Sequence, residues 1–500
     1  MPTTLLNLEY LEPKLAMTGL PLVSFSGGVL AIAGTGDSDI ITLDYDATQL
    51  TVVELNQSYL LKNITTINIA TGAGDDTVQL SYVGTKKPKW LGVAVVVRAQ
   101  EGNDVLRDAA GNAYFLGDDD VLTVSRKGDA RLDGLKLTWF DNNVADETLR
   151  STVKAQYADK VLSRGDMLAL FGAADDDDIL TAAEFTSLQA IVENKPLFRK
   201  LEDVLTLSNY VINGSVANAF FQQDTLGNLA VGSTGEQLER LVDKWFFGKD
   251  RPDAHDLDTD EEYQYREVSG TLFVNGVSYT DIRQGALGDC YLLAGLGAIA
   301  VHSSKPITSM FIVNGDGTYT VRFYNGATPY YITVDSQLPV SQADRLVFAS
   351  AGERYDDPSN ELWVPLVEKA YAQLAEFGWL DTGGDATNSY AAINAGWPGD
   401  VTGQATGKTV LDLLALDDPR VIAKAFASGR AVTFITPSQP VSPDVIGDHV
   451  YALVGYDART REFILFNPWG LNNGSVPGIV TLTWEGVLQN CYAWDYGPKV

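Results

Sequence analysis

An acidic turn containing glycine recurs through the first part of the chain and constrains the fold more than any other feature. Its four copies begin at Gly34, Gly72, Glu101 and Gly117 and read GTGDSDIITL, GAGDDTVQL, EGNDVL and GDDDVLTV. Glycine supplies the positive φ angle of a tight turn, and aspartate hydrogen-bonds to its own backbone. The alternating apolar and polar residues that follow, as in TVQLSY, are typical of strands. Residues 1–150 are therefore predicted to form an all-β domain.

These turns resemble the glycine–aspartate repeats of calcium-binding β-rolls, in which a GGxGxDx turn precedes a large apolar residue. The spacings between the four turns are irregular, at 38, 29 and 16 residues, whereas a β-roll repeats about every nine residues. Ligands from consecutive turns are therefore not expected to line up. Ordinary strand and turn packing in a small β-helix or sandwich is an equally good interpretation of this region.

Residues 151–250 change to a helical pattern that contains an acidic loop, in GDMLALFGAADDDDILTAAEFTSLQAIVENK. The loop resembles a degenerate EF-hand in which Asp175, Asp177 and Glu184 take the third, fifth and twelfth positions. The carboxylate expected at the first position and the glycine expected at the sixth are missing, which weakens calcium binding. The alternative is a helical hairpin in which Thr181 caps the second helix and Glu184 completes a capping box.

The chain is strongly acidic, with a net charge of −29. Such a chain repels a phosphate backbone, so nucleic acid is not expected as a partner, whereas divalent cations such as calcium are attracted. Cys290 and Cys491 are the only cysteines, which excludes a disulfide framework. No apolar stretch reaches the length of a transmembrane helix, so no transmembrane segment is predicted.

The start of the chain lacks the charged flank and long apolar run of a signal peptide. Leu11–Leu15 resembles the short LEPR-type segment near the start of some large bacterial surface and exported proteins, with Lys14 at the arginine position. This resemblance indicates a bacterial protein and leaves both the cytoplasm and the cell surface open as its location.

Residues 251–500 have the pattern of an α+β domain, and a cysteine stands at a turn-to-helix junction within it. In QGALGDCYLLAGLGAIA, a glycine-rich loop ends at Cys290 and an apolar helical run begins. The dipole and free N–H groups of a helix start stabilise a thiolate and lower its pKa. Gln284, six residues earlier, could direct its amide N–H groups at an oxyanion. The alternative is a buried structural cysteine.

Two later segments carry further candidate residues. His449 leads a predicted strand in GDHVYALVGYD, and Asn467 ends another in EFILFNPWG. An asparagine amide can hold a histidine ring in one tautomer, as a carboxylate does in serine triads, and Trp469 would shield that bond from water. Taken alone, His449 would be a strand-end residue and Asn-Pro a turn. The chain order of Cys, His and Asn is that of papain-like cysteine proteases.

Several segments resemble the calpain family of these proteases. QGALGDCYLLA is similar to its signature Gln-Gly-x-x-x-Gly-Asp-Cys, and DHVYALVGYD and FNPWG are similar to its histidine and asparagine segments. YYITVDSQLPV and ELWVPLVEKAYAQL match two intervening segments, so the similarity runs discontinuously over about 265–485. The resemblance implies an endopeptidase acting on protein substrates. It also implies a two-lobed papain-like core, with lobes of about 255–400 and 401–500.

The resemblance also implies residue roles. It makes Cys290 the nucleophile, His449 the general base, Asn467 the group that orients the histidine, Gln284 an oxyanion donor and Trp469 the cover of the site.

Calcium draws the two lobes of calpains together, and Asp281 matches a calcium-ligating aspartate of the family. Three departures put this switch in question. Tyr279 stands where the family has the arginine that couples the lobes, and LNNGSVPG replaces the acidic stretch after NPWG. Asp448 replaces a glycine before His449, and its carboxylate could raise the pKa of that base. The alternative function is a calcium-binding surface or matrix protein with a catalytically silent calpain-like scaffold.

Overall fold

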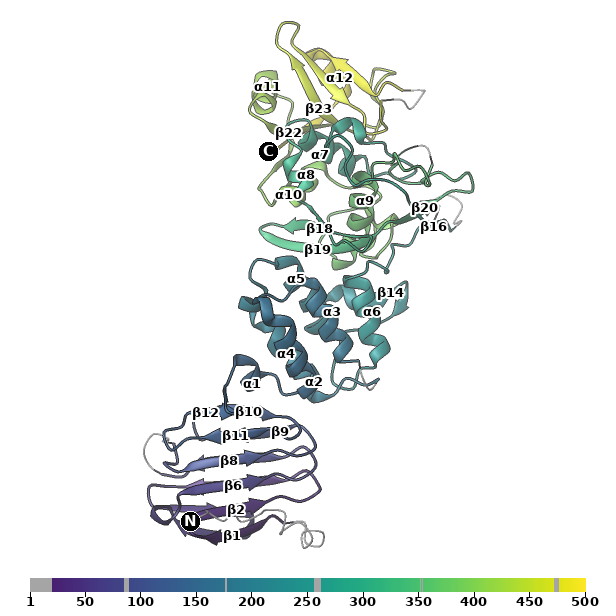
Figure 1. The fold of residues 1–500 in the computed structure, drawn as a ribbon. Coiled ribbons are helices and arrows are strands. Elements are labelled where there is room, and N and C mark those ends of the chain that lie inside the picture. The colour runs from purple at the N-terminus through teal and green to yellow at the C-terminus, as the bar shows by residue number, and fades with distance from the viewer. Residues whose placement is uncertain are drawn as a thin grey trace. The chain divides into compact units, whose positions relative to one another are not determined.

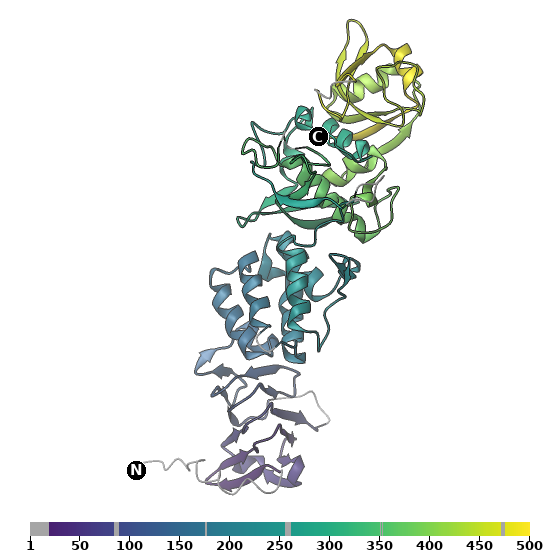
Figure 2. The same ribbon diagram turned by 90° about the vertical axis from the view of Figure 1, so that its right-hand side faces the viewer.

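The computed structural model describes residues 20–84, 90–175, 178–255, 262–350, 352, 354–471 and 476–500. The chain divides into two compact units (Figures 1 and 2). The N-terminal unit contains Met1–Ser208 and Leu229–Leu238, and the C-terminal unit contains Asn209–Asn228 and Glu239–Val500. Leu11–Leu15 lies outside the described residues. In the described ranges, no helix combines the length and the apolar character needed to cross a membrane.

Two β-sheets share one hydrophobic core in the N-terminal unit. Residues i and i+2 of a strand lie on the same face, so the alternating pattern places one apolar row of each strand in this core. The first sheet contains, in spatial order, β1 (Leu22–Ser26), β2 (Val29–Ala33), β6 (Thr66–Ala70), β8 (Ala94–Arg98), β11 (Val121–Val124), β12 (Ala130–Leu132) and β13 (Leu135–Lys136). The second contains β10 (Ala113–Leu116), β9 (Asp104–Arg107), β7 (Thr77–Tyr82), β3 (Ile40–Tyr45), β4 (Gln49–Val52) and β5 (Gln57–Leu60). The N-terminal region is thus β-rich, as predicted.

Three of the acidic turns stack on one another. The strands that follow them pair in parallel, β3 with β7 and β7 with β9. The N–H of Asp39 donates to Asp76 Oδ1 at 2.6 Å over a separation of 37 residues. The N–H of Asp76 donates to Asp104 Oδ1 at 2.9 Å over 28 residues. The irregular spacing therefore does not prevent the turns from lining up, because a coil can hold a loop of any length provided that its turn returns to the same place. That the carboxylates of these turns do not line up as calcium ligands stays a prediction.

Close stacking explains both the glycines and the buried acids of these turns. Gly72 has a φ of +104°, and a Cβ atom there would lie 1.8 Å from the carbonyl oxygen of Thr35 in the neighbouring turn. Asp104 also accepts a hydrogen bond from the Thr71 hydroxyl at 2.6 Å. Burial raises the pKa of Asp76 to about 7 and that of Asp104 to about 6.

Helices follow the sheets in the chain. Those within the N-terminal unit are α1 (Trp139–Asn143), α2 (Glu147–Gln156), α3 (Arg164–Ala173) and α4 (Ala182–Glu193). Contacts join α2 to both α3 and α4, and Figure 2 shows helices side by side in this part of the chain. Thr181 caps α4 and Glu184 completes its capping box, so the predicted capping box is confirmed. The next helices are α5 (Glu202–Ile212) and α6 (Gly235–Trp245).

The C-terminal unit contains an antiparallel sheet of six strands, three smaller sheets and several helices. The large sheet is ordered β21 (Leu411–Leu414), β26 (Ala493–Lys499), β22 (Arg430–Ile435), β23 (Val450–Asp457), β24 (Glu462–Phe466) and β25 (Ile479–Leu482). The smaller sheets are β17 (Phe311–Val313) with β18 (Thr318–Asn325) and β19 (Thr328–Asp335), β16 (Gln264–Glu267) with β20 (Gln337–Val340), and β14 (Phe220–Phe221) with β15 (Asp224–Thr225). The helices are α7 (Cys290–Ala300), α8 (Lys305–Thr308), α9 (Trp363–Leu374), α10 (Pro398–Thr406), α11 (Pro419–Ala427) and α12 (Trp484–Asn490).

Helix α7 lies at the centre of this unit. Its sequence is apolar on every side, and such a helix is stable only when it is buried on every side. Every residue after Cys290 in the helix is buried. Helix α7 packs against α10 and against β22 and β23 of the large sheet, as Figure 1 shows. The start of α7 is thereby fixed within the core, and only its first residue remains partly accessible.

Candidate active site

Cys290 is the first residue of α7, as predicted, and is partly buried. The preceding loop is held against neighbouring backbone. A Cβ atom at Gly285 would lie 2.1 Å from the carbonyl oxygen of Phe348, so only glycine fits there. The N–H of Gln284 donates to the carbonyl of Pro468 at 2.8 Å, which joins this loop to the segment just after Asn467. The cysteine loop and the asparagine segment, far apart in the sequence, are therefore in direct contact.

His449 and Asn467 form a hydrogen bond. His449 immediately precedes β23 and Asn467 immediately follows β24, as the sequence predicts. His449 Nε2 lies 2.9 Å from Asn467 Oδ1, and both side chains are buried. The backbone N–H of Trp469 donates to the same Oδ1 atom at 3.0 Å, and the Trp469 ring lies edge-on to His449 at 5.4 Å. The expected shielding of this bond by Trp469 is therefore consistent with the geometry, while the catalytic roles stay predictions.

The sulfur of Cys290 lies beside the first residue of β23, which directly follows His449. The backbone N–H of Val450, the next residue, is close enough to the sulfur to lower the pKa of the thiol. Burial has the larger effect and raises the pKa of Cys290 to about 12, and the charge of Asp289 raises it further. The expectation that the helix start lowers this pKa is therefore wrong for the free protein, because loss of water outweighs the backbone N–H groups.

Burial also has the largest effect on the pKa of His449. It lowers the pKa of His449 to about 4, although the hydrogen bond to Asn467 acts in the opposite direction. The expected rise caused by Asp448 is not found. Asp448 has a φ of +48°, in the left-handed region that favours glycine, which is the residue that the family has at this position. Aspartate tolerates this conformation better than most residues. Around neutral pH the pair is therefore a thiol and a neutral imidazole.

Gln284 does not present its amide to solvent. Its Nε2 atom donates to the carbonyl of Leu287 at 2.6 Å. Its Oε1 atom is buried and has no partner in standard hydrogen-bond geometry among the described residues. An oxyanion role for Gln284 stays a prediction, and it requires one N–H to leave Leu287.

Tyr279, at the position of the family's arginine, makes an aromatic contact. Its ring lies edge-on to that of Phe466 with the centroids 5.1 Å apart. Phe466 is the last residue of β24 and directly precedes Asn467. An apolar contact therefore joins the segment before Cys290 to the strand that leads into Asn467.

The carboxyl groups of Asp281 and Glu361 lie close enough to affect one another. Asp281 Oδ2 accepts from the Ser278 N–H at 2.6 Å and from Trp363 Nε1 at 3.2 Å, and Glu361 Oε1 accepts from the Val274 N–H at 2.8 Å. Burial raises the pKa of both carboxyls, that of Glu361 to about 7, and Asp281 adds to the rise at Glu361. Oxygen donors of this kind fit calcium, and Glu361 is a candidate ligand that the sequence reasoning missed.

The EF-hand-like loop is less favourable for a metal. Glu184 Oε2 is occupied by the N–H and the hydroxyl of Thr181, at 2.7 and 2.8 Å. Asp175 Oδ1 lies close to Gly235, and Asp177 falls outside the described residues. Within the part of the chain that the structure describes, no cluster of three or more His, Cys, Asp or Glu side chains is arranged to hold a metal ion. Calcium binding at this loop stays a prediction.

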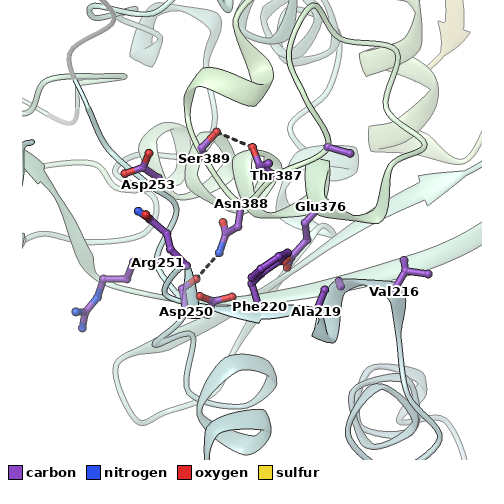
Figure 3. Close-up of a pocket in the computed structure, with 13 residues that line it drawn as sticks. Val216, Ala219, Phe220, Asp250, Arg251, Asp253, Glu376, Thr387, Asn388 and Ser389 are labelled. Carbon is purple, nitrogen blue, oxygen red and sulfur yellow. Dashed lines mark hydrogen bonds between the residues drawn. The ribbon is translucent and has the colours of Figure 1, made fainter. Parts of the chain in front are cut away.

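A separate cavity of about 410 Å³ lies in the C-terminal unit (Figure 3). Phe220, Asp250, Glu376 and Asn388 contribute to its wall, and Asn388 Nδ2 donates to the Asp250 carbonyl at 3.0 Å. None of the candidate catalytic residues lines it. Residues between 216 and 223, which precede the calpain-like segments, therefore help to line this cavity and belong to the C-terminal unit.

Comparison with known proteins identifies the C-terminal region. Residues 261–475 match the family model described as calpain family cysteine protease. The calpain of Schistosoma mansoni is 30% identical over 225 residues, which cover 40% of this chain and 27% of that protein. The calpain-2 catalytic subunit of Homo sapiens is 24% identical over 248 residues, covering 45% and 31%. Calpain-9 of Homo sapiens is 26% identical over 221 residues, covering 40% and 29%.

The chain therefore spans less than a third of the length of these curated relatives. Within that span the match includes the cysteine loop, the histidine and the asparagine described above. Residues 261–475 of this chain are a calpain family cysteine protease domain.

Proposed function

We propose that the chain is a calpain-like cysteine endopeptidase that uses Cys290, His449 and Asn467 as its catalytic triad. The observation that carries the proposal is the buried His449–Asn467 hydrogen bond on the strands next to Cys290, inside the matched region. The proposal includes a two-lobed papain-like core, with a lobe of about 255–400 that carries the cysteine and a lobe of about 401–500 that carries the histidine and asparagine.

The pKa values of the free site indicate how the reaction begins. Because Cys290 is a thiol and His449 is neutral, His449 takes the thiol proton as the sulfur attacks the peptide carbonyl carbon. Asn467 holds His449 through Nε2, which leaves Nδ1 to receive this proton. The carbonyl oxygen becomes an oxyanion, which accepts from the backbone N–H of Cys290 and from Gln284 once its N–H leaves Leu287.

The intermediate then collapses to a thioester. Protonated His449 gives its proton to the leaving amine, and the C–N bond breaks. A water molecule next gives a proton to His449 and attacks the thioester, which releases the acid and restores the thiol. Trp469 keeps bulk water from the His449–Asn467 hydrogen bond during these steps. Substrates are extended, accessible segments of proteins.

Calcium is proposed as the cofactor, with Asp281 and Glu361 as ligands. Burial makes both carboxylates costly in the absence of a cation, and a bound calcium ion would neutralise them. These residues would then fix the turn before the cysteine loop against the start of α9. A chelator is expected to lower activity, and Glu361→Gln should remove the calcium-dependent rise in melting temperature.

Hydrolysis of unfolded casein tests the proposal. Wild type and Cys290→Ala are incubated with casein in calcium and in chelator, and we expect the variant to lose at least about a thousandfold in rate. Equal, slow degradation by both proteins would contradict the protease assignment. Calcium binding by such an inactive protein would instead indicate a silent calpain-like scaffold. Activity that ignores the chelator would remove the calcium requirement and leave the protease.

A further inference from the structure

Two buried carboxyl groups interact with one another next to Cys290 in the sequence. Asp289 is the residue before it and has an exposed fraction of 0%, and Glu368 in the middle of α9 has 1%. Both Glu368 oxygens accept from the Ala349 N–H, at 2.9 and 3.1 Å. Neither oxygen of Asp289 has a partner in standard hydrogen-bond geometry among the described residues, and its side chain does not cap α7. A buried carboxylate without a donor is strongly unfavourable, so something must compensate Asp289.

The neighbours of Asp289 supply that compensation. At slightly longer range it interacts with the Glu368 carboxyl and the Gln284 carboxamide. Two ionised carboxylates cannot face one another in a buried site, so the pair must hold at least one proton. Burial and the charge of Asp289 hold the pKa of Glu368 well above its usual range, so the pair keeps a proton at neutral pH. Gln284 lowers the pKa of Asp289, as an amide N–H directed at a carboxylate does.

We propose that Asp289 and Glu368 are positioning residues, a carboxyl pair that shares a proton and holds the Gln284 carboxamide beside Cys290. In this proposal the Asp289 carboxyl group attracts one N–H of Gln284, and the other N–H, which donates to the Leu287 carbonyl, is free to move to the oxyanion. The kinetic effects expected of these two residues rest on the proposed peptidase function. Neither carboxyl group of the pair reacts with the substrate or with the Cys290 sulfur.

The pair also sets the charge beside the nucleophile. Burial raises the pKa of Asp289 to about 7, and that of Glu368 well above its usual range. The titratable groups that interact with the pair are Cys290 and Tyr291, which the charge of Asp289 affects, and Tyr390, which the charge of Glu368 affects. Above pH 7 the ionised Asp289 opposes formation of the thiolate at Cys290.

The pH dependence of casein hydrolysis tests this proposal. Asp289→Asn can still accept from Gln284 and donate to Glu368, but it does not titrate. We expect it to remain active, and the ratio of wild-type to variant kcat/KM to fall as the pH rises through about 7. A ratio that stays constant between about pH 5 and about pH 9 would overturn the proposal.

Removal of the carboxyl group tests the positioning role. Asp289→Ala should lower kcat, up to the roughly hundredfold loss that follows removal of an oxyanion donor, with little change in KM. Asp418→Ala, which removes a partly exposed carboxyl group at the start of α11, is the control for loss of an aspartate side chain away from the site and should leave kcat unchanged. A wild-type kcat for Asp289→Ala, or an equal loss for Asp418→Ala, would contradict the proposal.

An infrared measurement separates this proposal from the peptidase assignment. The difference spectrum of wild type and Glu368→Gln near neutral pH should contain the band of a protonated carboxylic acid. The measurement does not require peptidase activity, so it tests the shared proton even if casein is not cleaved. Absence of the band from a folded Glu368→Gln difference spectrum would overturn the shared proton.

Discussion

The stacked turns of the N-terminal unit and the loop before α7 both bury aspartates after a glycine, with opposite outcomes. In the stacked turns, Asp76 and Asp104 each accept a backbone N–H from the adjacent coil. In the α7 loop, Asp289 receives no such donor in standard geometry and faces a second acid and an amide. An aspartate shortly after a glycine is therefore structural where a backbone N–H of the adjacent coil donates to one of its oxygens. The Asp289 carboxyl group has no such donor, and it lies next to the candidate nucleophile Cys290.

Burial raises pKa values in both regions, so a raised pKa does not by itself distinguish them. Asp76 and Asp289 both have a pKa of about 7 for the same first cause, loss of water. What differs is the set of neighbours: parallel strands in one case, and Cys290 and Gln284 in the other. Variants in the two regions should therefore affect different measurements.

The largest expected effect is on catalysis. His449→Ala should lower casein hydrolysis by about ten-thousandfold, because the thiol then has no base, and should leave the melting temperature nearly unchanged. Rate assays and calorimetry on the same preparations check this. Hydrolysis at more than a tenth of the wild-type rate would remove His449 from the triad.

The next largest effect is on stability, at the buried lysine Lys244. Its side chain has an exposed fraction of 0% and pairs with Asp250 and, at 2.9 Å, with Glu376. Lys244→Ala leaves two buried carboxyl groups without their cation, and such a loss costs about 3–5 kcal/mol in the free energy of unfolding. Urea unfolding measures it. Lys249→Ala, from an exposed ion pair with Asp243, is the control and should cost less than about 1 kcal/mol.

Removal of an acid from the stacked turns should change stability and not activity. Asp104→Ala leaves the Asp76 N–H without its acceptor and removes the shorter of the two hydrogen bonds of the Thr71 hydroxyl, at a cost of about 1–3 kcal/mol. Hydrogen exchange of β7 and β9 in the full chain reports the loss locally. Unchanged protection of these strands, or a fall in kcat, would contradict the structural role.

The stability of the stacked turns should also depend on pH. The folded-state pKa of Asp76, about 7, lies above its ordinary value of 3.8, so the folded state binds the proton more tightly. Its contribution to stability is therefore full below pH 3.8 and is lost as the pH rises through about 7. Exchange protection of β7, corrected for the intrinsic rate, should fall over this window in wild type and less steeply in Asp76→Asn. Equal slopes for the two proteins would show that Asp76 does not titrate there.

The smallest effect is expected at the aromatic contact between Tyr279 and Phe466. Tyr279→Leu keeps the apolar volume and removes the edge-on pairing, which contributes about 0.5–1.5 kcal/mol. Tyr279→Phe keeps the ring and is the matched control. The difference between the two variants in urea unfolding measures the pairing, and equal stabilities would show that it contributes nothing.

Much of the local structure follows from local sequence signals. Glycine and aspartate at the turns, the capping box at Thr181 and Glu184, and the apolar run after Cys290 each act within a few residues, and each predicted element is present. The family resemblance likewise depends on short segments, and the protease domain was predicted from them. Glu361 and Glu368 lie in one of those segments, but nothing in their immediate neighbours distinguishes them from surface acids.

The remaining features depend on contacts between residues far apart in the chain. Whether aspartates 37 and 28 residues apart meet in stacked turns, and whether Glu368 meets Asp289, is decided by how whole strands and helices pack. Burial is decided in the same way, which is why the predicted low pKa of Cys290 was wrong. The sequence by itself determined the elements, the order of Cys290, His449 and Asn467, and the family. Only the tertiary structure decided which buried acids have donors and which share a proton, because desolvation and long-range pairing exist only after the chain has packed.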